Sequence, residues 1–150
     1  MKPLEKRTLH WIHQDHVLEH MLRLWKAQNP SIPVNIIVER LSFDLATEQF
    51  AVVYGPGFRL DGFVTWWRIN EVVLGAVQKL GEHTPADVRF ATVPAPSHVF
   101  VSCICTRPER RRLVNHLARV LREENPDCRE FIWIDQATGE LKTWERPTCH

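Results

Sequence analysis

The stretch HVFVSCICTRPERRRLVNHLARVLREE, residues 98–124, decides the fold. Residues 98–105 are apolar and rich in β-branched side chains, which predicts a strand, whereas residues 108–124 carry helical periodicity and predict an amphipathic helix. A further apolar run over residues 129–135 predicts a second strand. A strand, a helix and a strand in this order form a crossover, so we expect the two strands to be parallel and central in a sheet.

The boundary between the strand and the helix is unusually basic. Thr106 and Glu109 have the spacing of a capping box, and Pro108 stands in the first turn, where its missing N–H costs little. Four arginines crowd this boundary: Arg107, Arg110, Arg111 and Arg112. Cations are unfavourable at the positive end of a helix dipole unless an anion joins them, so the cluster predicts a site for a phosphate-bearing ligand. The alternative is a solvated helix start whose arginines pair with nearby acidic residues.

The remaining elements are predicted from periodicity and turn signals. Helices are expected over residues 8–27 and 70–81, and strands over residues 34–40, 49–54, 60–68, 88–93 and 140–145. Short connectors, one of them Gly55-Pro56-Gly57, favour an antiparallel meander of the first three strands. The pattern predicts an α+β fold in which a single mixed β-sheet carries helices on its faces, and residues 1–150 are expected to form a single domain.

Composition excludes several classes of function. The chain has 150 residues, 44% of them hydrophobic, and a net charge of +1, so bulk charge does not favour nucleic acid as a partner. No apolar run reaches the ~20 residues of a membrane span, and no signal peptide is evident, so a cytoplasmic protein with reduced cysteines is expected. Cys103 and Cys105 have no paired base beside them and are poor candidates for a nucleophile.

Three histidines lie along one face of the first predicted helix: His13, His16 and His20. Such a face suits metal binding or acid–base chemistry. Helical spacing supplies at most two good metal ligands, whereas zinc needs three or four, so no metal site is predicted. The alternative is an exposed polar helix face with no chemical role.

The order of elements resembles the acyl-CoA-dependent N-acyltransferase (GNAT) fold, in which a central strand ends at a helix that binds the cofactor's pyrophosphate. Within that superfamily the chain resembles the RTX toxin-activating lysine acyltransferases. The matching segments are short but run in the family's order: Trp11-Ile12 with Leu18, Ile32-Pro33-Val34, Gly62-Phe63-Val64-Thr65-Trp66, Asn125-Pro126-Asp127, and Phe131-Ile132-Trp133-Ile134-Asp135 with the turn at Gly139.

The resemblance implies a cytoplasmic, toxin-activating acyltransferase that moves an acyl group from an acyl carrier protein or acyl-CoA to a lysine amine of a protein. Acyl carrier protein and the protein acceptor would be its partners, homodimer formation is left open, and no tightly bound cofactor is implied. Counted from Trp11, the family's helix histidine falls on Glu19, beside His20, and its strand aspartate falls on Ser102. The resemblance therefore implies His20 as the base, with His16 one turn earlier as the reserve, and Ser102 as a hydrogen-bonding residue.

The same resemblance leaves a second class of function open. The pyrophosphate loop of GNAT proteins is rich in glycine, yet residues 105–112 contain none, so Arg107 and Arg110 to Arg112 would have to bind the donor phosphate with their side chains. A non-catalytic adaptor that kept the acyltransferase fold and binds another protein fits these departures too. Nucleic-acid binding is disfavoured, because the arginines cluster at one helix start.

Overall fold

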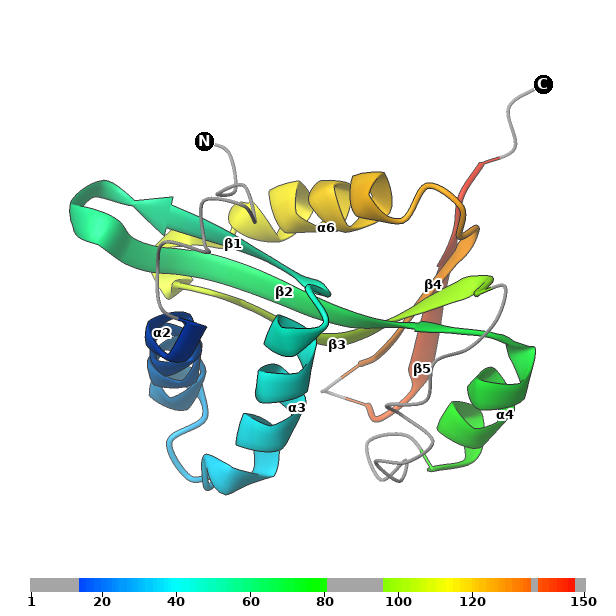
Figure 1. Ribbon diagram of the computed structural model, residues 1–150, viewed down its shortest axis with the longest axis horizontal. Helices are drawn as coiled ribbons and strands as arrows, with labels where there is room; N and C mark the ends of the chain where they lie inside the picture. Colours follow the sequence, from blue (N-terminus) through cyan, green and yellow to red (C-terminus); the bar gives the residue numbers. More distant parts are fainter. Residues whose placement is uncertain (1–13, 81–95, 136–137, 148–150) are drawn as a thin grey trace. The chain divides into compact units, whose positions relative to one another are not determined.

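The structure, a computed structural model, describes residues 14–80, 96–135 and 138–147. Its elements follow in the order α2 (Gln14–Gln28), α3 (Asn35–Ala46), β1 (Phe50–Gly55), β2 (Arg59–Ile69), α4 (Glu71–Leu80), β3 (His98–Thr106), α6 (Leu113–Glu124), β4 (Glu130–Ile134) and β5 (Leu141–Glu145). Within the described residues the strands form one mixed sheet in the order β1-β2-β3-β4-β5 (Figure 1). The predicted α+β class is confirmed, and the strand expected over residues 88–93 lies outside the described part.

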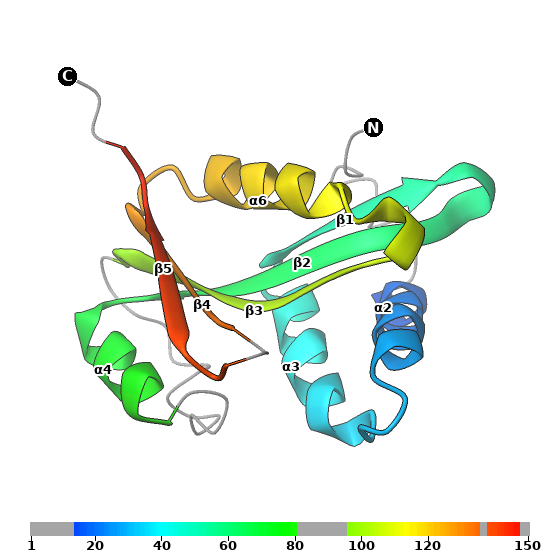
Figure 2. The ribbon, with the colours of Figure 1, turned by 180° about the vertical axis from the view of Figure 1, so that it is seen from behind.

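The chain divides into two compact units. The first comprises Met1–Thr65 and Cys103–Glu123, and the second Trp66–Ser102 and Glu124–His150. In the first unit, α2 and α3 lie on one face of the strands and α6 lies on the other (Figures 1 and 2). Side chains from both helices, from β1 and β2, and from β3 fill the core between them; its largest fully buried members are Phe63, Met21 and Leu41.

Residues 34–40, predicted as a strand, are helical instead, and that prediction is wrong. Helix α3 spans Asn35–Ala46, and its buried residues are Ile37, Leu41, Asp44 and Leu45. Apolar residues recur every three or four positions along the twelve residues, so a helix can bury one face. Burial of that face contributes more to stability than the β-preference of the short run at the start of the helix. The expected three-stranded meander is therefore reduced to the β1–β2 hairpin.

The β1–β2 hairpin turns where the glycines and proline predicted. Pro56–Phe58 form a single 3₁₀ turn, and Gly57 (φ 72°) and Phe58 (φ 59°) both adopt left-handed backbone conformations. Glycine meets this requirement without strain, whereas Phe58 does not. The two strands are antiparallel, with an irregularity between Val53 and Tyr54 that marks a β-bulge.

The junction of β3 and α6 differs from the expected capping box. Thr106 is the last residue of β3, Arg107 stands at the N-cap of a 3₁₀ turn over Pro108–Arg110 without a side-chain capping bond, and α6 begins only at Leu113. The expected helix over residues 108–124 is thus a 3₁₀ turn followed by an α-helix. Pro108 occupies the first turn as predicted, because its missing N–H has no partner to lose there.

Helix α6 approaches the strands closely through a glycine. A Cβ atom added to Gly62 of β2 would lie 3.3 Å from Leu117 Cδ1 and 3.3 Å from the backbone oxygen of Cys105. A larger residue at this position would require Leu117, which is fully buried, to shift by a few tenths of an ångström. The apolar face of α6, which the sequence pattern predicted, therefore packs against β2 and β3 within the first unit.

In the second unit the predicted crossover is confirmed. Strand β3 pairs with β4 in parallel, from His98 opposite Glu130 to Phe100 opposite Ile132, and β4 pairs with β5 as an antiparallel hairpin. A second core lies here, in which Trp67 and Phe100 stack with ring centroids 4.9 Å apart and α4 contributes Val73 and Val77.

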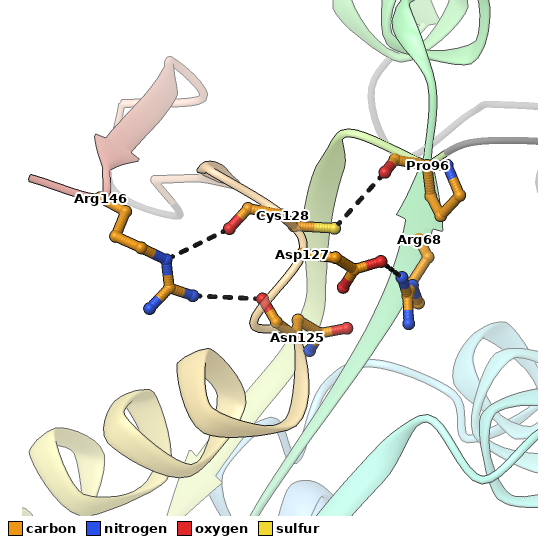
Figure 3. Close-up of polar contacts among 6 residues, drawn as sticks. All are labelled: Arg68, Pro96, Asn125, Asp127, Cys128 and Arg146. Atoms are coloured by element: carbon orange, nitrogen blue, oxygen red, sulfur yellow. Dashed lines mark hydrogen bonds and ion pairs between the residues drawn. The ribbon is translucent and has the colours of Figure 1, made fainter. Parts of the chain in front are cut away.

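A network of polar contacts fixes the turn that leads into β4 (Figure 3). Arg146 donates to the backbone oxygens of Asn125 (3.1 Å) and Cys128 (3.4 Å), and Arg68 of β2 forms an ion pair with Asp127. The Cys128 thiol faces the carbonyl of Pro96. The Asn125-Pro126-Asp127 break is therefore held in place by the side chains of Arg68 on β2 and of Arg146, the residue after β5.

The close packing of α6 gives a stability prediction with a control on the same helix. Leu117→Ala removes a fully buried side chain and should lower the free energy of unfolding by about 2–5 kcal/mol. Val114→Ala, at a position 40% exposed, should lower it by about 0.5 kcal/mol or less. Urea unfolding followed by circular dichroism measures both, and equal losses would contradict the packing described.

Candidate functional site

His20 is paired with a side chain that the sequence did not single out. It lies on α2, is partly buried, and its Nδ1 is 2.9 Å from the hydroxyl oxygen of Tyr54 on β1. The two rings meet edge to face, with centroids 5.7 Å apart. The hydrogen bond fixes the orientation of the imidazole, so a histidine expected from helical spacing gains the partner that a base needs to be held in position.

Tyr54 is held from the other side by the hairpin turn. The ring of Phe58 stacks on the Tyr54 ring with centroids 4.7 Å apart and an interplanar angle of 20°. Burial raises the pKa of the Tyr54 phenol to about 12, so the hydroxyl stays protonated at neutral pH. A neutral phenol can accept a hydrogen bond from Nδ1–H of His20, which leaves Nε2 with a free lone pair to accept a proton.

Ser102, the second expected catalytic residue, stands on β3 as predicted. Its hydroxyl oxygen is buried and has no hydrogen-bond partner among the described residues. The hydrogen bond of His20 goes to Tyr54 instead. A role for Ser102 beside His20 therefore stays a prediction.

Arg107, the first residue of the expected phosphate site, ties the end of β3 to β2. Its backbone N–H donates to the carbonyl of Asp61 (2.9 Å), and its side-chain Nε donates to the carbonyl of Leu60 (2.9 Å). Nε also lies 3.5 Å from Oδ1 of Asp61, a fully buried carboxylate. Gln28 at the end of α2 donates to the neighbouring carbonyl of Thr106. Arg107 is thus ordered by the protein before any ligand binds.

The other three arginines follow in sequence, Arg110 in the 3₁₀ turn and Arg111 and Arg112 between that turn and α6. Arg111 and Arg112 are exposed, and in the part of the chain that the structure describes they form no ion pair with an acidic residue. Glu109, the nearest acid in sequence, is likewise exposed. The structure therefore places three arginines around a short turn, and two of them have no acidic partner among the residues that it describes.

Of the three cysteines that the structure describes, Cys105 and Cys128 are buried and Cys103 is partly buried. Cys103, Cys105 and Cys128 are free thiols, while Cys149 lies outside the described residues. Burial raises the pKa of Cys105 to about 11, which keeps it protonated at neutral pH. A thiol in this state is a poor nucleophile, as the sequence indicated.

The histidine face does not gather a ligand set for a metal. His13 lies outside the described residues, and His16 is exposed. Across residues 14–80, 96–135 and 138–147, no group of three or more His, Cys, Asp or Glu side chains is arranged to hold a metal ion. Among the same residues, no helix combines the length and the apolar character that crossing a bilayer requires.

Comparison with known proteins finds a likeness of structure only. No protein-family model matches the chain, and no curated protein matches it by sequence. Among solved structures it is similar to the aminoglycoside N-acetyltransferase AAC(6')-Iy, in complex with the bisubstrate analog CoA-S-monomethyl-acetylneamine. The TM-score is 0.52 and the sequence identity 18%, over 88% of this chain and 92% of that chain.

The fold is GNAT-like. At this level of identity the likeness concerns the arrangement of elements, which agrees with the expectation from the sequence. It does not extend to the RTX toxin-activating family, and the α3 helix alters one segment on which that resemblance rested, since a strand was expected after Ile32-Pro33-Val34. That narrower family, like the single-domain organisation, stays a prediction.

The environment of Tyr54 can be tested directly, because it is the chain's one tyrosine. Alkaline titration followed by near-ultraviolet absorbance should give a midpoint near 12 for the native chain and near 10.0 in guanidinium chloride. Between these values the unfolded state binds fewer protons than the folded state, so stability should fall as pH rises from about 10 to about 12. A native midpoint near that of the denatured chain would show that the phenol is not buried.

Proposed function

We propose that the protein is an N-acyltransferase that moves an acyl group from a thioester, acyl-CoA or acyl carrier protein, to a primary amine, with the lysine side chain of a protein as acceptor. The observation that carries the proposal is the His20–Tyr54 pair, 2.9 Å between Nδ1 and the hydroxyl oxygen, in a GNAT-like fold. The solved relative binds a CoA-based bisubstrate analog, which supports a CoA thioester as donor. The resemblance to the toxin-activating family supports acyl carrier protein and a lysine.

The chemistry assigns one proton transfer to His20. The amine nitrogen attacks the thioester carbonyl carbon, a C–N bond forms and the C–S bond breaks. The lone pair on Nε2 of His20 accepts the proton that the amine loses, while Nδ1–H stays bonded to the Tyr54 hydroxyl. The departing thiolate takes a proton from solvent to become the free thiol, and His20 releases the amine's proton to solvent. Because Cys105 is buried and protonated, transfer is direct from donor to amine without an acyl-cysteine.

The arginines have the role of binding the donor. The guanidinium groups of Arg107, Arg110, Arg111 and Arg112 bind the phosphate of the phosphopantetheine moiety. Arg107 is already ordered by Leu60 and Asp61. Guanidinium groups bind phosphate oxygens in pairs, which suits a region where the backbone offers few N–H groups. The acidic surface of an acyl carrier protein would also be attracted to this region.

A second function is favoured by a specific observation. The backbone N–H of Arg107 is used by Asp61, Pro108 has none, and residues 105–112 contain no glycine. A chain that no longer binds thioester donors would be an adaptor on an acyltransferase fold. Calorimetry with acyl-CoA and with acyl carrier protein separates the two functions, because an adaptor binds neither and is recovered instead with a stable protein partner.

Substitution of the base tests the enzyme. His20→Ala should lower kcat/KM by about 10²-fold or more, since the proton acceptor is lost, and Tyr54→Phe by roughly fivefold, the worth of one hydrogen bond. His16→Ala on the same helix is the matched control and should leave the rate unchanged. Release of free thiol from acyl-CoA in the presence of a lysine peptide measures all three. A rate lost with His16→Ala and kept with His20→Ala would move the role to His16.

Substitution of the arginine turn tests the donor site. Replacing Arg110, Arg111 and Arg112 together with Ala removes three exposed or partly exposed cations and should weaken acyl-CoA binding about tenfold or more, with a smaller loss at high salt. Arg119→Ala, on the exposed side of α6, controls for general charge and should have little effect. Calorimetric affinities that are equal for the wild type and the triple variant would remove these residues from the site.

A further inference from the structure

Asp61 occupies an irregular position in β2. In the pairing of the hairpin, Val53 lies opposite Gly62 and Tyr54 lies opposite Leu60, so Asp61 is the extra residue of a bulge. Bulges change the direction in which a side chain leaves a strand. Here the bulge accompanies a carboxylate that is fully buried, although buried carboxylates are costly unless cations accompany them.

Two arginines contact this carboxylate, each through its own Nε atom. Oδ1 of Asp61 lies 3.2 Å from Nε of Arg59 and 3.5 Å from Nε of Arg107. The two arginine side chains remain 50% and 30% exposed. Since the contacts use Nε, the terminal nitrogens of both guanidinium groups are left to bind another group, and the three residues together carry one positive charge.

The space around the carboxylate leaves little freedom for it to move. Oδ2 is buried and has no hydrogen-bond partner among the described residues, and a Cβ atom added to Gly55 would lie only 2.3 Å from it. Glycine at this position of the hairpin is therefore required by the carboxylate. Gly55 and Asp61 together determine where the two guanidinium groups stand.

We propose that Arg59 and Arg107 form a two-arginine site for a phosphate or pyrophosphate group, and that Asp61 is the positioning residue that aims both guanidinium groups. Nothing in the sequence singled out Arg59, which stands 48 residues before Arg107 and reaches the same carboxylate from the start of β2. That the phosphate belongs to a thioester donor rests on the proposed function; the anion site itself rests on the geometry.

The charge of Asp61 and its proposed positioning role predict opposite effects of Asp61→Asn on the affinity for an anion. Loss of the carboxylate raises the local charge by one, which on its own would strengthen binding of an anion. If the carboxylate aims the guanidinium groups, its loss weakens binding in spite of the added positive charge. The sign of the change therefore separates a positioning residue from a mere counter-ion.

The experiment measures binding of CoA and of inorganic pyrophosphate to the full chain by calorimetry. Arg59→Ala should weaken both about tenfold or more, Arg59→Lys should restore only part of the loss because lysine lacks the fork, and Arg119→Ala should bind as the wild type does. Asp61→Asn should weaken both ligands. Gly55→Ala, which keeps every charge and displaces the carboxylate, should do the same if Asp61→Asn does not fold.

The outcomes separate the two-arginine site, the positioning role of Asp61 and the acyl-CoA donor. If the wild type binds CoA and Arg59→Ala binds it equally well, the two-arginine site is overturned while the donor proposal stands. If pyrophosphate binds and requires Arg59 but CoA does not bind, the site stands and the acyl-CoA donor is lost. Tighter binding by Asp61→Asn would overturn the positioning role, and failure of the wild type to bind either ligand would overturn the site and the CoA donor together.

Discussion

The contacts of Arg107 with β2 are the constraint on which the first unit depends. The residue uses its backbone N–H for the Asp61 carbonyl and its Nε for the Leu60 carbonyl, so both main chain and side chain fix where β3 ends. The 3₁₀ turn over Pro108–Arg110 starts from that point, and α6 follows it. Gly62, next to Asp61, then leaves room for Leu117 of α6. The end of one strand thus determines both the packing of a helix and the position of the basic turn.

Much of the fold could be predicted from the sequence because the periodic signals were long. The crossover from β3 through α6 to β4, the hairpin turn at Gly57 and the apolar face of α4 all follow from patterns that local structure obeys. The failure at residues 34–40 came from a short window: two isoleucines and two valines look like a strand, whereas Leu41 and Leu45 reveal a helix only when twelve residues are considered together. The predicted capping box does not form, because Thr106 is the last residue of strand β3 and does not stand at the N-cap of a helix.

Candidate site residues could be named from the sequence where a local pattern or the resemblance pointed to them, but their contacts could not. His20 was a candidate because it lies on the histidine face and beside the position that the resemblance indicated. Its partner Tyr54 is 34 residues away, and no local pattern predicts a contact between a helix and a hairpin. Asp61 and Arg59 were missed for a related reason. A bulge exists only as a mismatch between two paired strands, so the residue that it buries cannot be recognised from either strand alone.

The proposed two-arginine site would let a GNAT-like fold without a glycine loop bind an anion. Glycine loops bind phosphate with backbone N–H groups, but here Arg107 gives its N–H to Asp61 and Pro108 has none. Side chains must then replace the backbone, and a flexible arginine loses conformational entropy when it is ordered by a ligand. In the proposed site, Asp61 reduces this entropy loss because it contacts both Nε atoms and so orders the two guanidinium groups before the ligand binds. The buried carboxylate, unfavourable in isolation, is thereby the feature that makes an arginine site workable in place of a backbone one.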